Sequence, residues 1–598
     1  MPRIGGPNRG SVEKPNNFGK TLKKLFNDLN KYHISILIAL IFAIISSVIA
    51  IICPNILSDL VDVITDGLKK SIDMNLVRKM SLTLLILFSC SSIIGYFQNF
   101  VLATVSNKYA LNLRERIVSK LNKLPLKYFD NHETGDILSR ISNDVDNISQ
   151  NLNHSLGTLA SGMTLLIGST IMMFTTNVVM SISAIIASLF GFALMFLILS
   201  KSQKYFDMKQ AGLGNLNSHI EEIYSGHDIV KVYNGEKNAK KEFDKLNKDL
   251  YYNNQKSQFL SGLMPPMMGF IGNFGYVVVC IVGAYLTIKG KISFGVIVAF
   301  MIYIRLFTNP LSQIAQAMSS LQSTAASAER VFEFLNEKEM TDESKLDLIK
   351  DIKNIKGNIE FKNVRFSYND DKVIIKNFSA NIKDGQKIAI VGPTGAGKTT
   401  LVNLLMKFYD INEGDIIIDG ISIKNISREQ IHELFTMVLQ DTWLFNGTIK
   451  ENIVFNNKNI TENKIWDVLS IVGIKHFVKT LSGGLNAIVD NGESVSQGEK
   501  QLLTIARGML EDTPFLILDE ATSNVDTRTE ELVQKAMDKL TKGKTSFIIA
   551  HRLSTIKNAD LILVMNEGNI VEQGTHSSLM KKKGAYYELY NSQFSKNI

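Results

Sequence analysis

The sequence QKIAIVGPTGAGKTTLVNLLMKFY, at residues 386–409, indicates how the C-terminal half of this chain folds. Its apolar start, KIAIV, is typical of a strand that is buried on both faces. The residues that follow, GPTGAGKT at 392–399, have the spacing G-x-x-x-x-G-K-[ST], and an apolar helical pattern begins directly after them. A buried strand, a glycine-rich loop and a helix in this order predict a phosphate-binding loop in an α/β domain.

The chemistry of such a loop assigns roles to its residues. Glycines allow backbone N–H groups to surround phosphate oxygens, and the helix N-terminus adds the positive end of its dipole. Lys398 is expected to reach the β- and γ-phosphates of ATP, and the Thr399 hydroxyl is expected to hold Mg²⁺. The residues assigned to this part of the nucleotide site are Gly392, Gly395, Gly397, Lys398, Thr399 and Thr400.

A second apolar run, PFLILDE at residues 514–520, ends in two carboxylates. An acid at the end of a parallel strand can bind Mg²⁺, which we expect of Asp519, and its neighbour Glu520 can polarise the attacking water. Two adjacent acids are usually solvated surface residues. The buried strand before them favours a catalytic interpretation, because it ends beside the phosphate-binding loop in this class of fold.

The N-terminal half of the chain is of a different kind. Its apolar stretches reach the length of about 20 residues that a membrane-spanning helix needs. Buried helices of a large soluble core do not account for stretches of this length and number, so we predict a membrane domain of six spans. The stretches lie near residues 34–57, 78–104, 155–176, 178–200, 259–288 and 294–318.

Charges between the apolar stretches predict the orientation of the spans. The long polar segments after spans two and four carry many lysines and arginines, and the positive-inside rule places these segments and both termini in the cytoplasm. Lys289 and Lys291, in the short loop between spans five and six, mildly oppose this orientation. Since lysines in such segments account for most of the net charge of +8, nucleic acid is not needed as a partner.

The membrane and nucleotide motifs together resemble the exporters of the ATP-binding-cassette (ABC) family over nearly the whole chain. LPLKYFDNHETGDILSRISNDVDNI, residues 124–148, is similar to the family's first coupling-helix region, and ASAERVFEFL, residues 326–335, to its exit from span six. The resemblance implies a membrane all-α domain of six helices followed by an α/β P-loop NTPase domain. It also implies a multi-pass protein of the cell membrane, with ATP and Mg²⁺ as cofactors.

The resemblance implies roles for further residues. Tyr368 matches the aromatic residue that stacks on adenine, Gln440 the glutamine that contacts nucleotide and Mg²⁺, and His551 the switch histidine of catalysis. Ser523-Asn-Val-Asp526 matches the loop that supplies Asp526, although the family more often has Ala-Leu at its centre. The parts that we assign are a cytoplasmic segment (1–32), a transmembrane domain (33–338), a linker (339–354) and a nucleotide-binding domain (355–598).

The family's signature, LSGGQ, contacts the nucleotide of the opposite subunit, and this chain has two candidates for it. LSGG at residues 481–484 lies too early in the sequence, so we interpret it as a turn. The signature position precedes KQLLTIARGML and reads VSQGE at residues 495–499. Ser496 and Gly498 are retained there, whereas the first glycine and the final glutamine of the signature are replaced.

The two replacements, Gln497 and Glu499, predict an asymmetric dimer. A side chain at Gln497 crowds the close backbone approach that glycine permits, and Glu499 adds a negative charge near a triphosphate. A homodimer would carry both changes in both ATP sites. We therefore expect the partner to be a second, non-identical half-transporter whose intact signature completes the competent site of this chain.

The resemblance implies ATP-driven export of a hydrophobic or small amphipathic substrate across the lipid bilayer. A homodimeric exporter and an ATP-gated channel or regulatory subunit stay open as alternatives, while six spans exclude a soluble cassette ATPase. Arg305 lies within span six, where a charge is costly. Two interpretations of it stay open, a side chain that faces a cavity or partner and one that reaches to the membrane edge.

Overall fold

The computed structural model of this protein describes residues 17–68, 71–343, 346, 355–369, 372–439, 442–455, 457, 459–489, 495–519, 527–549 and 556–594. The described residues form two compact units, one from 1–124 and 132–338 and the other from 125–131 and 339–598. The short segment 125–131 therefore belongs with the C-terminal unit, although the chain on both sides of it belongs with the first unit.

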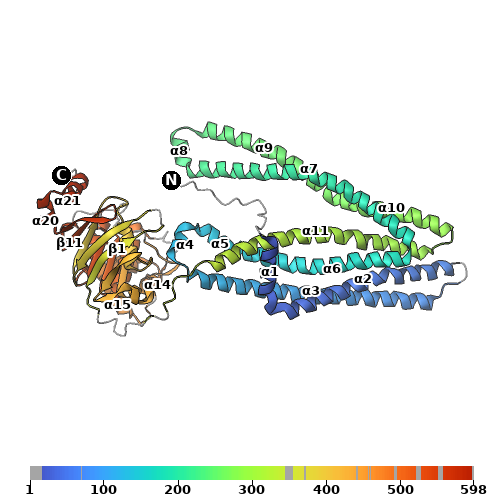
Figure 1. Ribbon diagram of the computed structural model, residues 1–598, viewed down its shortest axis with the longest axis horizontal. Helices are drawn as coiled ribbons and strands as arrows, with labels where there is room; N and C mark the ends of the chain where they lie inside the picture. Colours follow the sequence, from blue (N-terminus) through green and yellow to red (C-terminus); the bar gives the residue numbers. More distant parts are fainter. Residues whose placement is uncertain are drawn as a thin grey trace. The chain divides into compact units, whose positions relative to one another are not determined.

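The first unit is built from α-helices (Figure 1). They are α1 (Phe18–Asp28), α2 (His33–Gly67), α3 (Met74–Leu121), α5 (Thr134–Ser139), α6 (Val145–Thr176), α7 (Val178–Ser225), α8 (His227–Val232), α9 (Glu236–Gly262), α10 (Met264–Ile288) and α11 (Phe294–Asn336). Six helical segments are long and apolar enough to cross a membrane, and the shortest of them has 43 residues. Such a helix is about twice as long as the hydrocarbon core of a bilayer is thick, so its ends extend well beyond that core.

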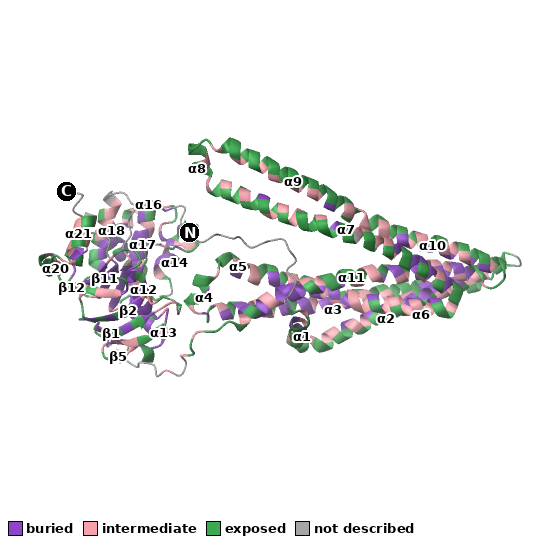
Figure 2. Ribbon diagram, turned by 45° about the horizontal axis from the view of Figure 1, so that its top comes forward, coloured by how far each residue is buried: buried purple, intermediate pink, exposed green. Residues whose placement is uncertain are grey.

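The long helices form two groups, which diverge along their length (Figures 1 and 2). α2, α3, α6 and α11 pack along one another, and α7, α9 and α10 form a second group that reaches to its tip at α8. The groups meet where α6 turns into α7, around the buried side chains of Met173, Met180, Val279 and Phe300. In this region the buried Tyr303 hydroxyl donates a hydrogen bond of 2.8 Å to Oδ1 of Asn55 in α2.

Polar side chains join the helices beyond their apolar parts. The Asp28 carboxylate at the end of α1 accepts hydrogen bonds from the Tyr109 hydroxyl (3.1 Å) and from Nη1 of Arg116 (2.6 Å), both in α3. The buried Asp144 carboxylate, just before α6, accepts a hydrogen bond of 2.9 Å from Nε of Arg330 in α11. These contacts hold the helices together beyond the apolar parts that are long enough to lie in a membrane.

The second unit is an α/β domain with two sheets. The larger sheet has six strands in the order β12-β11-β3-β10-β9-β6, and the smaller has four in the order β2-β1-β4-β5. The larger sheet consists of β3 (Lys387–Val391), β6 (Phe435–Val438), β9 (Phe515–Asp519), β10 (Thr545–Ile549), β11 (Leu561–Asn566) and β12 (Asn569–Gly574). The smaller consists of β1 (Ile359–Phe366), β2 (Ile375–Ile382), β4 (Glu413–Ile418) and β5 (Ile421–Ser422), and β7 (Gly447–Thr448) pairs with β8 (Ile488–Val489).

Helices accompany both sheets of the second unit. They are α4 (Leu126–Asn131), α12 (Lys398–Leu405), α13 (Arg428–Leu434), α14 (Ile449–Val454), α15 (Glu462–Val472), α16 (Lys475–Thr480), α17 (Gln497–Leu510), α18 (Thr527–Leu540), α20 (His576–Lys582) and α21 (Ala585–Phe594). Leu401 and Leu405 of α12 are buried in one core with residues of both sheets. This packing fixes the helix that follows the phosphate-binding loop.

The parallel part of the larger sheet determines which loops lie together. Phe547 of β10 pairs with Ile388 of β3 on one side and with Ile517 of β9 on the other. The carboxyl ends of β3, β10 and β9 therefore lie side by side at one edge of the sheet. Six long apolar helices followed by this α/β domain confirm the predicted fold class.

Candidate nucleotide-binding site

The phosphate-binding loop connects β3 to α12 and needs glycine at two positions for different reasons. Gly397, the residue before α12, has φ of +98°, a conformation that L side chains rarely adopt. At Gly392 a Cβ atom would lie 2.2 Å from the carbonyl oxygen of Met565. Among the described residues no side chain caps the N-terminus of α12, so its first N–H groups are available to an anion.

Lys398 lies against this loop. Its side chain is buried, and its ammonium group donates hydrogen bonds to the carbonyl oxygens of Gly392 (2.8 Å) and Pro393 (3.0 Å). Burial lowers the pKa of Lys398, and the nearby Asp519 carboxylate raises it in part. The two carbonyl groups thus hold the ammonium group where phosphate oxygens would replace them as its partners.

Tyr368 lies beside α12 and connects the loop to an aromatic cluster. Its hydroxyl donates a hydrogen bond of 3.2 Å to Oγ1 of Thr400, which is buried, whereas Thr399 is exposed. The Tyr368 ring packs edge-to-face on the rings of Phe366 and Tyr409, with centroid distances of 4.9 and 4.8 Å. A ring that stacks on adenine must be accessible beside the phosphate-binding loop, and Tyr368 is half-buried there.

The sequence analysis did not identify Tyr409 or its partner Asp130. The Tyr409 hydroxyl donates a hydrogen bond to Oδ2 of Asp130 in α4. Burial raises the pKa of Tyr409, and this hydrogen bond raises it further. α4 lies in the segment that resembles the first coupling-helix region. Asp130, Tyr409, Tyr368 and Thr400 thus form a continuous series of contacts from α4 to the helix of the phosphate-binding loop.

Oxygen ligands near the loop fit Mg²⁺. Asp519 ends β9, which is separated from β3 only by β10, and its charge acts on Lys398. The described residues contain no group of three or more His, Cys, Asp or Glu side chains that could hold a metal ion alone. Mg²⁺ usually takes one or two protein ligands and completes its shell with water and phosphate, so the hydroxyl of Thr399 and the carboxylate of Asp519 are compatible with it.

The remaining predicted residues of this site lie outside the described residues: Gln440, Glu520, Asp526 and His551. The strands before three of them are described. β6 ends at Val438, β9 at Asp519 and β10 at Ile549. β6, β9 and β10 run parallel to one another. Their carboxyl ends therefore lie at the edge of the sheet that bears the phosphate-binding loop.

The signature residues form the start of α17, and the structure gives Glu499 a role that the sequence analysis missed. Oε2 of Glu499 accepts hydrogen bonds from the backbone N–H (2.8 Å) and the hydroxyl group (2.7 Å) of Ser496. The Glu499 N–H lies 3.3 Å from the Ser496 oxygen, which completes a reciprocal capping box. The spacing S-x-x-E before an apolar run is the sequence signal of this motif.

Two further features complete the picture of the signature. Nε2 of Gln497 lies 3.3 Å from Oγ1 of Thr442 and donates a hydrogen bond to it, while Gly498 is buried. The second candidate, at residues 481–484, follows α16 and leads into a short 3₁₀ helix, Gly484–Asn486. The interpretation of that segment as a turn is therefore confirmed.

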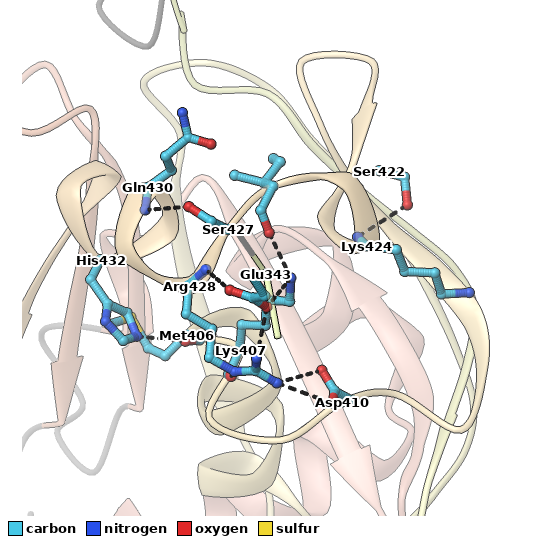
Figure 3. A network of polar contacts seen from close by, with 11 residues as sticks. Glu343, Met406, Lys407, Asp410, Ser422, Lys424, Ser427, Arg428, Gln430 and His432 are labelled. Carbon is cyan, nitrogen blue, oxygen red and sulfur yellow. Dashed lines mark hydrogen bonds and ion pairs between the residues drawn. The ribbon is translucent and has the colours of Figure 1, made fainter. Parts of the chain in front are cut away.

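A buried ion-pair network, which the sequence analysis also missed, holds the linker to the second unit (Figure 3). Oε1 of Glu343 lies 2.9 Å from Nζ of Lys407 and 2.7 Å from Nη1 of Arg428, and Arg428 also pairs with Asp410. Burial raises the pKa of Glu343, but hydrogen bonds from Arg428 and Lys407 outweigh it and lower the pKa overall. The chain after α11 is thus fixed beside α12 and α13.

Comparisons with known proteins agree with this geometry. The family model of the ABC transporter transmembrane region matches residues 36–311, and a second family model, described as ABC transporter, matches residues 375–523. A fatty acid ABC transporter ATP-binding/permease protein of Mycobacterium bovis is 41% identical over 87% of this chain and 82% of its own length. An uncharacterized ABC transporter ATP-binding protein of Bacillus subtilis is 36% identical over 96% of this chain and 94% of its own. An ATP-dependent lipid A-core flippase of Syntrophus aciditrophicus is 31% identical over 87% and 86%.

Proposed function

This chain belongs to the ABC transporter family, with a membrane domain and a nucleotide-binding domain on one chain, and we propose that it is one subunit of an asymmetric exporter. Membership makes it an ATPase coupled to transport across a membrane. The partner in this proposal is a second, non-identical half-transporter. The cargo is a hydrophobic or amphipathic molecule, which the names of the mycobacterial and Syntrophus relatives support.

The observation that carries the asymmetric assignment is the capping box at the start of α17. The Ser496 hydroxyl, which the family presents to the nucleotide of the opposite subunit, here donates to the carboxylate of Glu499. Phosphate that approaches Ser496 must compete with this carboxylate and is repelled by its charge. The exposed side chain of Gln497 lies beside it. A second ATP site capped by this helix is therefore poorly suited to fast turnover, whereas the phosphate-binding loop of this chain is intact.

In the proposed hydrolysis at the competent site, Glu520 accepts a proton from the attacking water. The water oxygen bonds to the γ-phosphorus while the bond from this phosphorus to the β–γ bridging oxygen breaks. Lys398 stabilises the charge on the phosphate oxygens, and His551 acts with Glu520 beside the γ-phosphate. Thr399, Asp519 and Gln440 would hold Mg²⁺, which neutralises phosphate charge when bound.

The remaining contacts in this proposal hold the nucleotide itself. Tyr368 stacks on adenine, and the backbone N–H groups of the phosphate-binding loop, with Thr400, contact the phosphates. Asp526 contributes from the chain just before α18. Ser496 and Gly498 are assigned to the nucleotide of the partner's site, with the weakened contact described above.

We also propose that both termini lie in the cytoplasm and that α7 to α10 pack onto the partner subunit. The divergence of this group from α11 supports the exchange, because it leaves the tip at α8 without cover from the described residues of its own unit (Figure 2). Ile229, Val232 and Tyr233 at this tip are exposed. Apolar side chains outside a bilayer are expected to be covered, which a partner subunit would do.

Purification of the complex through a tag on this chain tests the proposal. We expect equal amounts of this chain and of a second half-transporter, with ATP hydrolysis that rises on addition of transported amphiphiles. This chain purified alone should hydrolyse ATP slowly. A homodimer with vigorous, substrate-stimulated hydrolysis would contradict the asymmetric arrangement. Hydrolysis without uptake into inverted vesicles would instead favour a channel or regulatory subunit.

A further inference from the structure

One face of α11 changes from apolar to polar at Arg305. Residues spaced by three and four lie on the same side of a helix, so they define a face. Towards the start of α11 this face carries Phe294, Val298 and Ile302, and from the middle onward it carries Arg305, Asn309, Ser312 and Gln316. Arg305, Asn309 and Gln316 are exposed in this chain. The other side of the helix is packed, with Phe300, Tyr303 and Ile304 buried.

The position of Arg305 along α11 places it deep in the membrane. It lies three helical turns after Phe294, which corresponds to about 16 Å along the axis. With the start of α11 taken as the outer edge of the hydrocarbon core, which is about 30 Å thick, Arg305 lies near the middle of that core. A charged side chain at this depth is costly unless it meets water, an opposite charge or a hydrogen-bonding partner.

The protein itself supplies no such partner among its described residues. No hydrogen bond or ion pair involves the side chains of Arg305, Asn309 or Gln316 in the part of the chain that the structure describes. Arg305 is also the only charged residue of α11 before Glu329. Asp62 of α2, which lies beside the start of α11, accepts a hydrogen bond of 2.7 Å from the backbone N–H of Gly295.

We infer that this face binds an anionic amphiphile, a molecule with a carboxylate or phosphate headgroup and a long apolar chain. The guanidinium group of Arg305 pairs with the headgroup, since its planar donors match carboxylate and phosphate oxygens. The side-chain amides of Asn309 and Gln316 donate further hydrogen bonds to the headgroup. The apolar chain lies along Phe294, Val298 and Ile302. This inference rests on the proposed export function and names the substrate class of its cavity.

The headgroup assignment follows from the charge pattern of the face. A cationic headgroup would add a second positive charge beside Arg305, and this face offers no carboxylate to balance it. A neutral amphiphile would satisfy the amides but leave the guanidinium group without a counter-charge in a medium of low dielectric constant. An anion satisfies both the arginine and the amides.

A matched series of ligands tests the inference. The complex, purified through a tag on this chain, is placed in nanodiscs of neutral phosphatidylcholine. Direct binding is measured for oleate, oleyl phosphate, oleyl alcohol and oleylamine, which share one chain and differ in headgroup. We expect oleate or oleyl phosphate to bind at least about tenfold more tightly than the alcohol and the amine, and the tighter of the two identifies the headgroup.

Variants test whether the charge of Arg305 is responsible for the preference for an anionic headgroup. Arg305→Gln should weaken binding of the anionic ligand about tenfold and leave oleyl alcohol unchanged, and Arg305→Lys should retain much of the preference. Arg78→Gln, an exposed arginine at the start of α3, serves as the matched control and should change nothing. Equal binding of the four ligands, or an unchanged preference in Arg305→Gln, would overturn the inference. Basal ATP hydrolysis, recorded in parallel, tests the proposed function separately.

Discussion

Two helix N-termini of the nucleotide-binding unit, those of α12 and α17, both follow a loop that the family directs at phosphate. α12 begins after Gly397, and no described side chain caps its first turn. α17 begins after Ser496, whose hydroxyl and N–H group are bound by the carboxylate of Glu499. The N-terminus of α12 is open to an anion, whereas the N-terminus of α17 is already bound by the carboxylate of Glu499.

On the proposed function, the two termini differ in phosphate binding because the first N–H groups of α17 are satisfied within the chain and those of α12 are not capped by a described side chain. A capping box satisfies N–H groups at the start of a helix and so stabilises it. It also brings a negative charge to the place where a phosphate would bind. In this chain the stabilised terminus is the one that the proposed function assigns to the slow site. The following predictions test this contrast, from the largest expected effect to the smallest.

Replacement of glutamate by glutamine at residue 520 and at residue 499 should change ATP turnover to very different extents. Glu520→Gln removes the proposed general base, so ATP turnover should fall about 10²-fold or more while ATP still binds. Glu499→Gln, the matched control, retains a residue that can close the capping box and should change turnover by less than about twofold. Steady-state hydrolysis and equilibrium ATP binding by the purified complex measure both. Wild-type turnover in Glu520→Gln would assign the base to another residue.

The second prediction concerns Gln497. Gln497→Gly removes the side chain that reaches Thr442 and restores the close backbone approach of glycine. We expect ATP to bind about fivefold more tightly to the site capped by α17, with total hydrolysis changed by less than about twofold. Counting bound nucleotides at low ATP concentration measures this effect, and Gln497→Ala separates loss of the side chain from gain of backbone freedom. A severalfold rise in total hydrolysis would mean that this signature serves a fast site, as in a homodimer.

Local signals in the sequence predicted the loop and the helix start at the N-terminus of α12 well. The spacing of Gly392, Gly397 and Lys398 specifies a loop that wraps phosphate, because backbone conformation depends on residues close together in the chain. The six apolar stretches were equally informative, since length alone separates a spanning helix from a buried one. The capping box of Ser496 and Glu499 is just as local, and it was missed because these residues were compared only with the family signature.

Contacts between distant parts of the chain could not be predicted in this way. Asp130 and Tyr409 are 279 residues apart, and their hydrogen bond depends on α4 belonging with the second unit. Glu343 lies in a polar linker that gives no sequence signal of burial, yet Lys407 and Arg428 enclose it. Such partners are brought together by sheet topology and packing, which single-sequence periodicity does not encode.

The third prediction concerns communication between the open terminus and α4. Tyr409→Phe removes the hydroxyl that binds Asp130 but leaves the ring against Tyr368. We expect the amount of substrate transported per ATP to fall about threefold, in line with the net loss of one intramolecular hydrogen bond, with ATP affinity unchanged. Tyr586→Phe removes a hydroxyl that binds His576 elsewhere in the same unit and is the control. Equal transport per ATP in Tyr409→Phe and the wild type would exclude this role.

The smallest effect is expected from the capping box itself. Ser496→Ala removes the hydroxyl at the start of α17 and leaves Glu499 with only the backbone N–H of its partner, which should cost about 1 kcal/mol of stability. Because α17 contributes Leu502, Leu503 and Ile505 to the core, this loss should lower the unfolding temperature of the nucleotide-binding unit by about 2 °C without nucleotide. Ser496→Thr, which keeps a hydroxyl, should restore it. Calorimetry of the full chain without ATP isolates this structural contribution, and an unchanged unfolding temperature in Ser496→Ala would show that the box does not stabilise the second terminus.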